Sequence, residues 1–178
     1  MKETTAKQEL LAISERLVDL SEELDRLREA GDESGYSTVT KQLRDIGDEL
    51  VGYTKTTEGD DLAYTHFALG SLCSMLGYLH QAEKSYREAL AYWPDHIGLL
   101  NELFDCLMDQ NKYAPAKEVI EKSIEHGGET PIIMQNYAVV LTHLKKLNEA
   151  KVVLFNCMAK FPGDQRTREL MNTLEGGE

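Results

Sequence analysis

In the first 53 residues the spacing of apolar side chains is typical of two amphipathic helices. Between residues 5 and 30 apolar residues recur at alternating intervals of three and four, which predicts one long amphipathic helix. Gly31 ends it, residues 31–37 read as a turn with Ser37 as the next N-cap, and a second helix is expected over residues 38–53. The apolar seam of the first helix consists of Leu10, Ile13, Leu17, Leu20, Leu24 and Leu27.

Two such helices joined by a short turn predict an antiparallel hairpin. At about 1.5 Å per residue the first helix is about 39 Å long and the second about 24 Å. Ala6, Leu10 and Leu11 therefore have no partner inside the hairpin. They must pack on the rest of the chain, pair with a second chain, or fray. The seam is therefore consistent with two arrangements, an internal hairpin and a dimerising coiled coil.

From residue 63 to residue 164 the apolar pattern repeats with a period of 34 residues. Three units follow, 63–96, 97–130 and 131–164, each with two helices and a short inner turn. Residues 54–61 are a polar link, so residues 1–62 form a hairpin module with its linker, and residues 165–178 form a short capping helix and tail. Equivalent positions of the units include Ala82, Ala116 and Ala150, and Gly77, Asn111 and Lys145 in the inner turns.

This period and its apolar positions resemble the tetratricopeptide repeat, a family of stacked helix pairs. The resemblance implies an all-α fold, an α-solenoid superhelix preceded by a coiled-coil-like αα-hairpin. The chain departs from the family at His66, where a large apolar residue is usual, and at Phe104, where a small one is usual. Gly128 replaces the closing proline of the second unit.

In this family the first helix of each unit lines a concave groove that takes a peptide of the partner. Residues at the matching places stand in all three units. They are Tyr64, Phe67, Ala68, Ser71 and Met75 in the first; Asn101, Glu102, Asp105, Met108 and Asp109 in the second; and Ile132, Gln135, Asn136, Val139 and His143 in the third.

The best-known groove of the family clamps a carboxylate with lysine, asparagine and arginine side chains. Those places here hold no cation, so that chaperone-cofactor role is not expected. Glu102, Asp105 and Asp109 instead form one acidic stripe, at positions i, i+3 and i+7. We expect a client with apolar side chains around a lysine or arginine, and a solvated acidic face without a ligand remains the alternative.

The formal net charge of −12 and the pI near 4.9 argue against nucleic acid or an anionic membrane as the partner. Residues 62–82 lack formal charge over 21 residues, but their polar residues and their place in the repeat favour paired helices over a membrane span. No secretory signal is visible at the N-terminus. The three cysteines include no CxxC spacing, which suggests a reducing, cytoplasmic compartment, with Cys106 as the thiol of most interest.

No catalytic or metal-binding motif stands out, so we expect neither an enzyme nor a cofactor. The leading hypothesis is a non-enzymatic adaptor, assembly factor or chaperone-like protein that binds a client protein or peptide. A structural oligomer, its groove filled by its own hairpin or a neighbour, is the second. The chain also resembles the small acidic three-repeat chaperones of bacterial type III secretion translocators in size, repeat number and pI, although its hairpin is longer than theirs.

Overall fold

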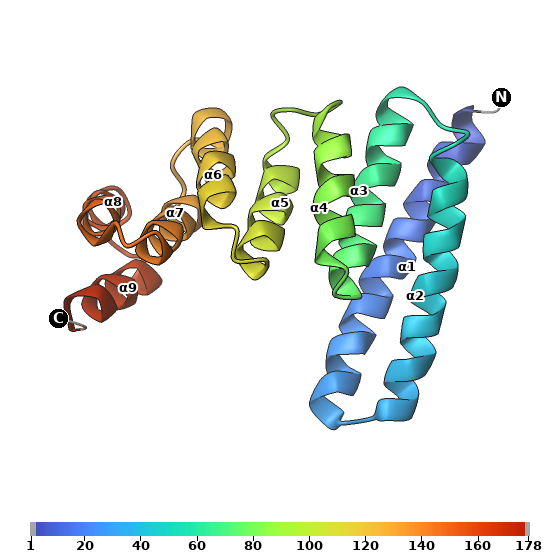
Figure 1. The fold of residues 1–178 in the computed structure, drawn as a ribbon, viewed down its shortest axis with the longest axis horizontal. Helices are drawn as coiled ribbons and strands as arrows, with labels where there is room; N and C mark the ends of the chain where they lie inside the picture. The colour runs from blue at the N-terminus through green and yellow to red at the C-terminus, as the bar shows by residue number, and fades with distance from the viewer. Residues whose placement is uncertain (1–2, 177–178) are drawn as a thin grey trace. The chain divides into compact units, whose positions relative to one another are not determined.

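The computed structural model describes residues 3–176, with side chains from Lys7 onward. The regular secondary structure of these residues is helical throughout, which confirms the all-α prediction (Figure 1). Two compact units are formed, unit 1 by residues 1–94 and unit 2 by residues 95–178. The helices are α1 (Glu3–Ala30), α2 (Glu33–Tyr53), α3 (Gly59–Met75), α4 (Leu79–Leu90), α5 (Ile97–Asp109), α6 (Tyr113–Gly127), α7 (Pro131–His143), α8 (Leu147–Lys160) and α9 (Gln165–Gly176).

Unit 1 begins with the hairpin of α1 and α2, which lie side by side in Figure 1. Gly31, with a φ of 68°, ends α1, and α2 begins at once because the carboxylate of Asp32 accepts a hydrogen bond from the Gly35 amide at 3.0 Å. The predicted N-cap Ser37 is therefore wrong, and it lies inside α2. Five seam residues are buried and the sixth, Leu27, is half-buried against them.

Helix α3 packs on both helices of the hairpin. Its residues Ala68 and Leu72 are buried in the same apolar cluster as the seam. Leu10 is 1% exposed in this cluster, so it packs on the repeat, whereas Leu11 is 48% exposed. The side chain of Ala6 lies outside the described residues. The hairpin and the first repeat share one core, so both belong to the compact unit that ends at residue 94.

The pairing of α3 with α4 depends on a glycine. Gly70 faces the ring of Tyr86, and a Cβ atom added to Gly70 would lie 3.1 Å from the ring Cγ and closer still to Cδ1 and Cε1. Tyr86 is fully buried, as are Ala82 and Ala89 on the same helix. His66 is half-buried, with its Nδ1 atom 3.0 Å from a Glu88 carboxylate oxygen.

Unit 2 contains the pairs α5–α6 and α7–α8, and α9 packs on α8 and α7. A compact cluster around Leu141, Ala150 and Leu154 receives Met171 of α9, so this last helix covers apolar surface of the pair before it.

The inner turns of the three repeats have the same geometry. Gly77, Asn111 and Lys145 have φ values of 75°, 58° and 64°. In each turn the next amide bonds to the carbonyl five residues earlier, as in the 2.8 Å bond from Tyr78 to Cys73. This is the Schellman motif, which satisfies carbonyls at the helix end. The 34-residue period is therefore a period of backbone geometry as well as of side chains.

Candidate functional site

The acidic stripe predicted on the second repeat lies on the exposed face of α5. Glu102, Asp105 and Asp109 are all exposed, while Leu103 and Leu107 of the same helix are buried in unit 2. Partial desolvation raises the pKa of Asp105 above its usual value, and the nearby charges of Glu102 and Asp109 raise it further. The three carboxylates therefore repel one another when all are ionised.

The other two α5 residues at groove positions are half-buried. They are Asn101 and Met108. The Oδ1 atom of Asn101 is buried and accepts no hydrogen bond from the side chains or backbone that the structure describes. Because this atom is buried, it is not directly accessible to an incoming N–H group.

Helix α7 places two of its predicted groove residues at a small apolar pocket. Val139 and His143 lie in its wall, and its volume is about 140 Å³. The His143 ring stacks on Tyr113, with ring centroids 4.4 Å apart. Asn136 is half-buried and Ile132 is 64% exposed. The remaining pocket walls come from α7, α8 and α9, namely Ala138, Thr142, Leu154, Leu170, Thr173 and Leu174.

Gln135 does not belong to this exposed face. Its side chain is 3% exposed, and its Nε2 atom donates to Asp164 Oδ1 at 2.7 Å and to Thr167 Oγ1 at 3.0 Å. Thr167 donates in turn to the same Asp164 oxygen at 2.6 Å, and this bond is the main cause that lowers the pKa of Asp164. The groove prediction for Gln135 is corrected, because this residue anchors the start of α9.

The groove positions of unit 1 are divided between two environments. Phe67 and Ser71 are half-buried, and the Phe67 ring lies 6.3 Å from that of Tyr86. Tyr64, Ala68 and Met75 instead pack against the hairpin cluster, and the Tyr64 hydroxyl is 2.8 Å from Ser14 Oγ of α1. The hairpin therefore covers part of the face on which a groove was predicted.

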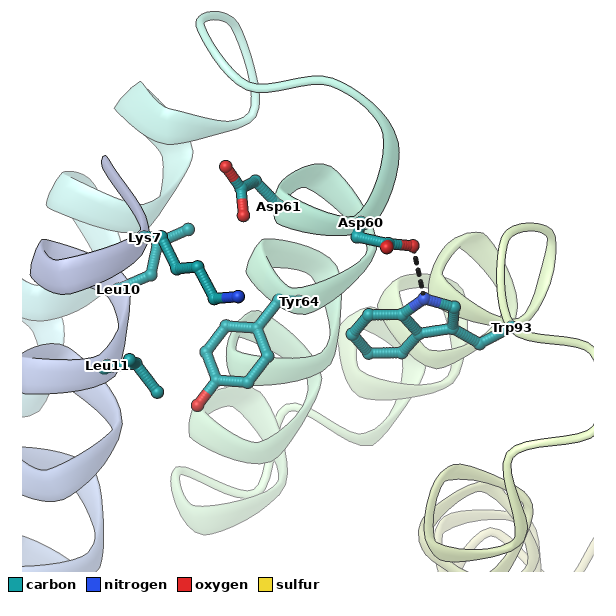
Figure 2. A pocket seen from close by; sticks show the side chains of 7 residues that line it. All are labelled: Lys7, Leu10, Leu11, Asp60, Asp61, Tyr64 and Trp93. Atoms are coloured by element: carbon teal, nitrogen blue, oxygen red, sulfur yellow. Dashed lines mark hydrogen bonds between the residues drawn. The ribbon is translucent and has the colours of Figure 1, made fainter. Parts of the chain in front are cut away.

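A pocket that the sequence did not reveal lies in unit 1 between α1, α3 and the segment after α4 (Figure 2). We name it the Trp93 pocket. Its volume is about 270 Å³. The chain's only tryptophan, directly before Pro94, is a signal that could have drawn attention to it. The side chains that line it are Lys7, Leu10, Leu11, Asp60, Asp61, Tyr64 and Trp93.

Other chemistry is limited in the described part of the chain. Residues 3–176 include no group of three His, Cys, Asp or Glu side chains arranged to hold a metal ion. Nor does any helix in that range combine the length and apolarity needed to cross a membrane. Cys106 is only 2% exposed, so the thiol expected to be of most interest is closed to solvent, and its sulfur lies 3.4 Å from Gln110 Nε2.

Comparison with known protein families identifies one of the three predicted repeats. Residues 63–96 match the family model described as tetratricopeptide repeat. They are a tetratricopeptide repeat. The match has the same bounds as the first predicted unit, with the Gly70–Tyr86 contact at its centre. No curated protein sequence matches the chain.

Solved tetratricopeptide-repeat structures share the fold at low sequence identity. MamA residues 41 to the end from Desulfovibrio magneticus RS-1 has a TM-score of 0.65 at 12% identity, covering 88% of this chain and 84% of that one. A tetratricopeptide repeat protein from Parabacteroides merdae has a TM-score of 0.63 at 16% identity, with coverages of 96% and 72%. The first such domain of Spaghetti (RPAP3), bound to the HSP90 peptide SRMEEVD, has a TM-score of 0.58 at 14% identity, with coverages of 67% and 98%. At these identities the likeness establishes the tetratricopeptide-repeat fold.

Proposed function

We propose that this chain is a non-enzymatic protein-binding module that holds a client segment on the exposed face of α5 and α7 in unit 2. The observation that carries the proposal is the acidic stripe of Glu102, Asp105 and Asp109 on a tetratricopeptide-repeat helix. The client segment presents a lysine or arginine to this stripe. Such an adaptor or assembly role needs no cofactor.

Electrostatics supports a cationic client. The raised pKa of Asp105 means that its ionised form is disfavoured in the free protein, partly by Glu102 and Asp109. A bound ammonium or guanidinium group relieves this repulsion and favours the ionised carboxylate. Client affinity should therefore rise with pH as Asp105 loses its proton.

The small pocket beside Val139 and His143 supports the apolar part of the client. At about 140 Å³ it is well below the roughly 300–1,000 Å³ of small-molecule sites, so one apolar side chain fits it better than a whole ligand. A short segment with one basic and one apolar residue suits this face.

The Spaghetti domain provides a useful contrast, because its structure holds the peptide SRMEEVD, which has three acidic residues among its last four. Here Glu102 and Asn136 stand at two of the places where the family's carboxylate clamp has polar or cationic side chains. The client proposed for unit 2 therefore has the opposite charge.

In unit 1 the predicted groove face of α3 is in a different situation from the face of α5 and α7. Tyr64 and Met75 pack against the hairpin, so the chain itself occupies part of that face. We propose that the hairpin acts there as an internal cover, while α5 and α7 take the foreign segment. A homodimer through the seam would have to open the hairpin core, because Leu17 and Leu24 are 4% and 2% exposed.

Selection from a random displayed-peptide library tests the proposal. The full chain should enrich peptides with a basic and an apolar residue, and Glu102→Lys with Asp105→Lys should weaken their binding at least about tenfold. A control with Glu118→Lys and Glu125→Lys makes the same charge change at exposed positions of α6 and should bind normally. Undiminished binding by the first variant, or enrichment without basic residues, would contradict the proposal.

A further inference from the structure

The Trp93 pocket is a concave site in unit 1 that is separate from the proposed client face of α5 and α7. Two aromatic rings form its walls. The rings of Tyr64 and Trp93 meet edge to face, with centroids 6.4 Å apart and planes at 69°. Both rings are held in place, since Trp93 Nε1 donates to Asp60 Oδ1 at 2.9 Å and the Tyr64 hydroxyl contacts Ser14. The site is thus preorganised rather than assembled by its ligand.

The charges around this pocket favour a cation. Asp60 and Asp61 stand in the first turn of α3 and line the pocket. The Asp61 carboxylate has no hydrogen-bond or ion-pair partner among the described side chains, while Asp60 is engaged by Trp93. Acidic residues also stabilise a helix N-terminus, but that role needs no aromatic cavity beside them.

Lys7 shows that the pocket tolerates a positive charge. It extends from α1 into the space between Asp61 and Tyr64 (Figure 2). Lys7 is exposed, so its long side chain can move away into solvent. With two carboxylates and one ammonium, the lining keeps an excess of one negative charge. An incoming cation must compete with Lys7 for the same place.

We propose that the Trp93 pocket binds an arginine side chain of a partner protein. A volume of about 270 Å³ suits a single long side chain rather than a drug-sized molecule. The planar guanidinium group can stack on Trp93 or Tyr64 and bond to the Asp61 carboxylate, which a lysine ammonium does less well. Leu10 and Leu11 provide an apolar wall for the arginine methylenes.

The only tryptophan of the chain makes the proposal directly measurable. A capped pentapeptide of glycine and serine with one central arginine is titrated into the full chain while Trp93 fluorescence is followed. The signal should saturate with a millimolar dissociation constant. The same peptide with citrulline, which has nearly the same shape without the charge, should bind at least about fivefold more weakly. Free N-acetyltryptophanamide corrects for collisional quenching, which does not saturate.

Two substitutions test the charge logic. Lys7→Met removes the competing cation and should tighten binding about three- to tenfold, and Asp61→Asn should weaken it by a similar factor. Lys41→Met, the same charge change at an exposed position of α2, is the matched control and should leave affinity unchanged. Equal binding of arginine and citrulline, weaker binding by Lys7→Met, or a fluorescence change that never saturates would each overturn the proposal. None of these results depends on the client face of unit 2.

Discussion

Replacing Gly70 by alanine should destabilise unit 1, although alanine is the better helix former. In an open helix position this change gains about 1 kcal/mol. At Gly70 the new methyl carbon would lie 3.1 Å from Tyr86 Cγ and nearer to two other ring carbons, whereas ordinary carbon contacts begin at about 3.5 Å. Tyr86 is fully buried, so a movement of its ring has to displace neighbouring atoms. Overpacking of this kind costs about 1–3 kcal/mol, and here it should exceed the gain in helix propensity.

Because two ring carbons would lie even closer than Cγ, the overpacking cost should fall in the upper part of this range, and the expected net loss after the gain in helix propensity is about 1–2 kcal/mol. For a unit of this size it lowers Tm by between about 4 and 16 °C. Thermal unfolding followed by circular dichroism and scanning calorimetry measures it. Gly47→Ala is the matched control, because its Cβ atom would lie at an ordinary contact distance of 3.5 Å from Leu72 and should stabilise the same unit by about 0.5–1 kcal/mol.

A double-mutant cycle identifies the cause of the loss. Tyr86→Leu removes the ring, so Gly70→Ala should cost much less in that background than in the wild-type chain. If Gly70→Ala raises Tm as Gly47→Ala does, or if its cost is the same with leucine at position 86, the steric explanation is refuted.

Two further substitutions probe unit 2. The pKa of Asp105 is higher in the folded than in the unfolded chain, so the wild-type protein loses stability as the pH rises from the unfolded pKa through the folded pKa, and the loss persists at higher pH. Asp105→Asn should therefore raise the free energy of unfolding by about 0.5 kcal/mol at about pH 7 and by almost nothing at about pH 3. An equal gain at both pH values in urea unfolding would contradict this. Thr167→Val keeps the side-chain shape but removes a buried hydroxyl that bonds to Gln135 and Asp164. The free energy of unfolding in urea should fall by about 1–3 kcal/mol. An unchanged urea midpoint would show that these hydrogen bonds do not anchor α9.

The repeat could be predicted from sequence because its packing is local. Ala82, Ala116 and Ala150 are each fully buried, and each contributes to the pairing of two helices adjacent in the chain. A 34-residue spacing of small residues at such contacts predicts the helix pair without knowledge of distant contacts.

The start of α2 could not be predicted in this way. Gly35 and two serines suggested a turn over residues 31–37, yet Gly35 lies within the helix. A Cβ atom at Gly35 would lie 2.6 Å from Leu27 Cδ2. This glycine permits the close approach of two helices, and in a sequence such a residue looks the same as a turn glycine.

The candidate sites could not be predicted fully from sequence, because they are formed by contacts between segments that are distant in the chain. Gln135 is buried through Asp164 and Thr167, 29 and 32 residues further along the chain. Tyr64 meets Ser14 across 50 residues, and Trp93 meets Asp60 across 33. Helical periodicity assigns each residue to a face of its own helix, but it does not show which other segment covers that face.

The three inner turns show how far the backbone conformation is independent of the side chain. Glycine adopts a left-handed conformation without steric cost and asparagine tolerates it, whereas for most other residues, such as lysine, it costs about 1–2 kcal/mol. Gly77, Asn111 and Lys145 nonetheless adopt it with φ values within about 17° of one another. The packed helices on either side therefore impose this turn on whichever residue is there. The same backbone path thus accommodates a glycine, an amide side chain and a charged side chain within one molecule.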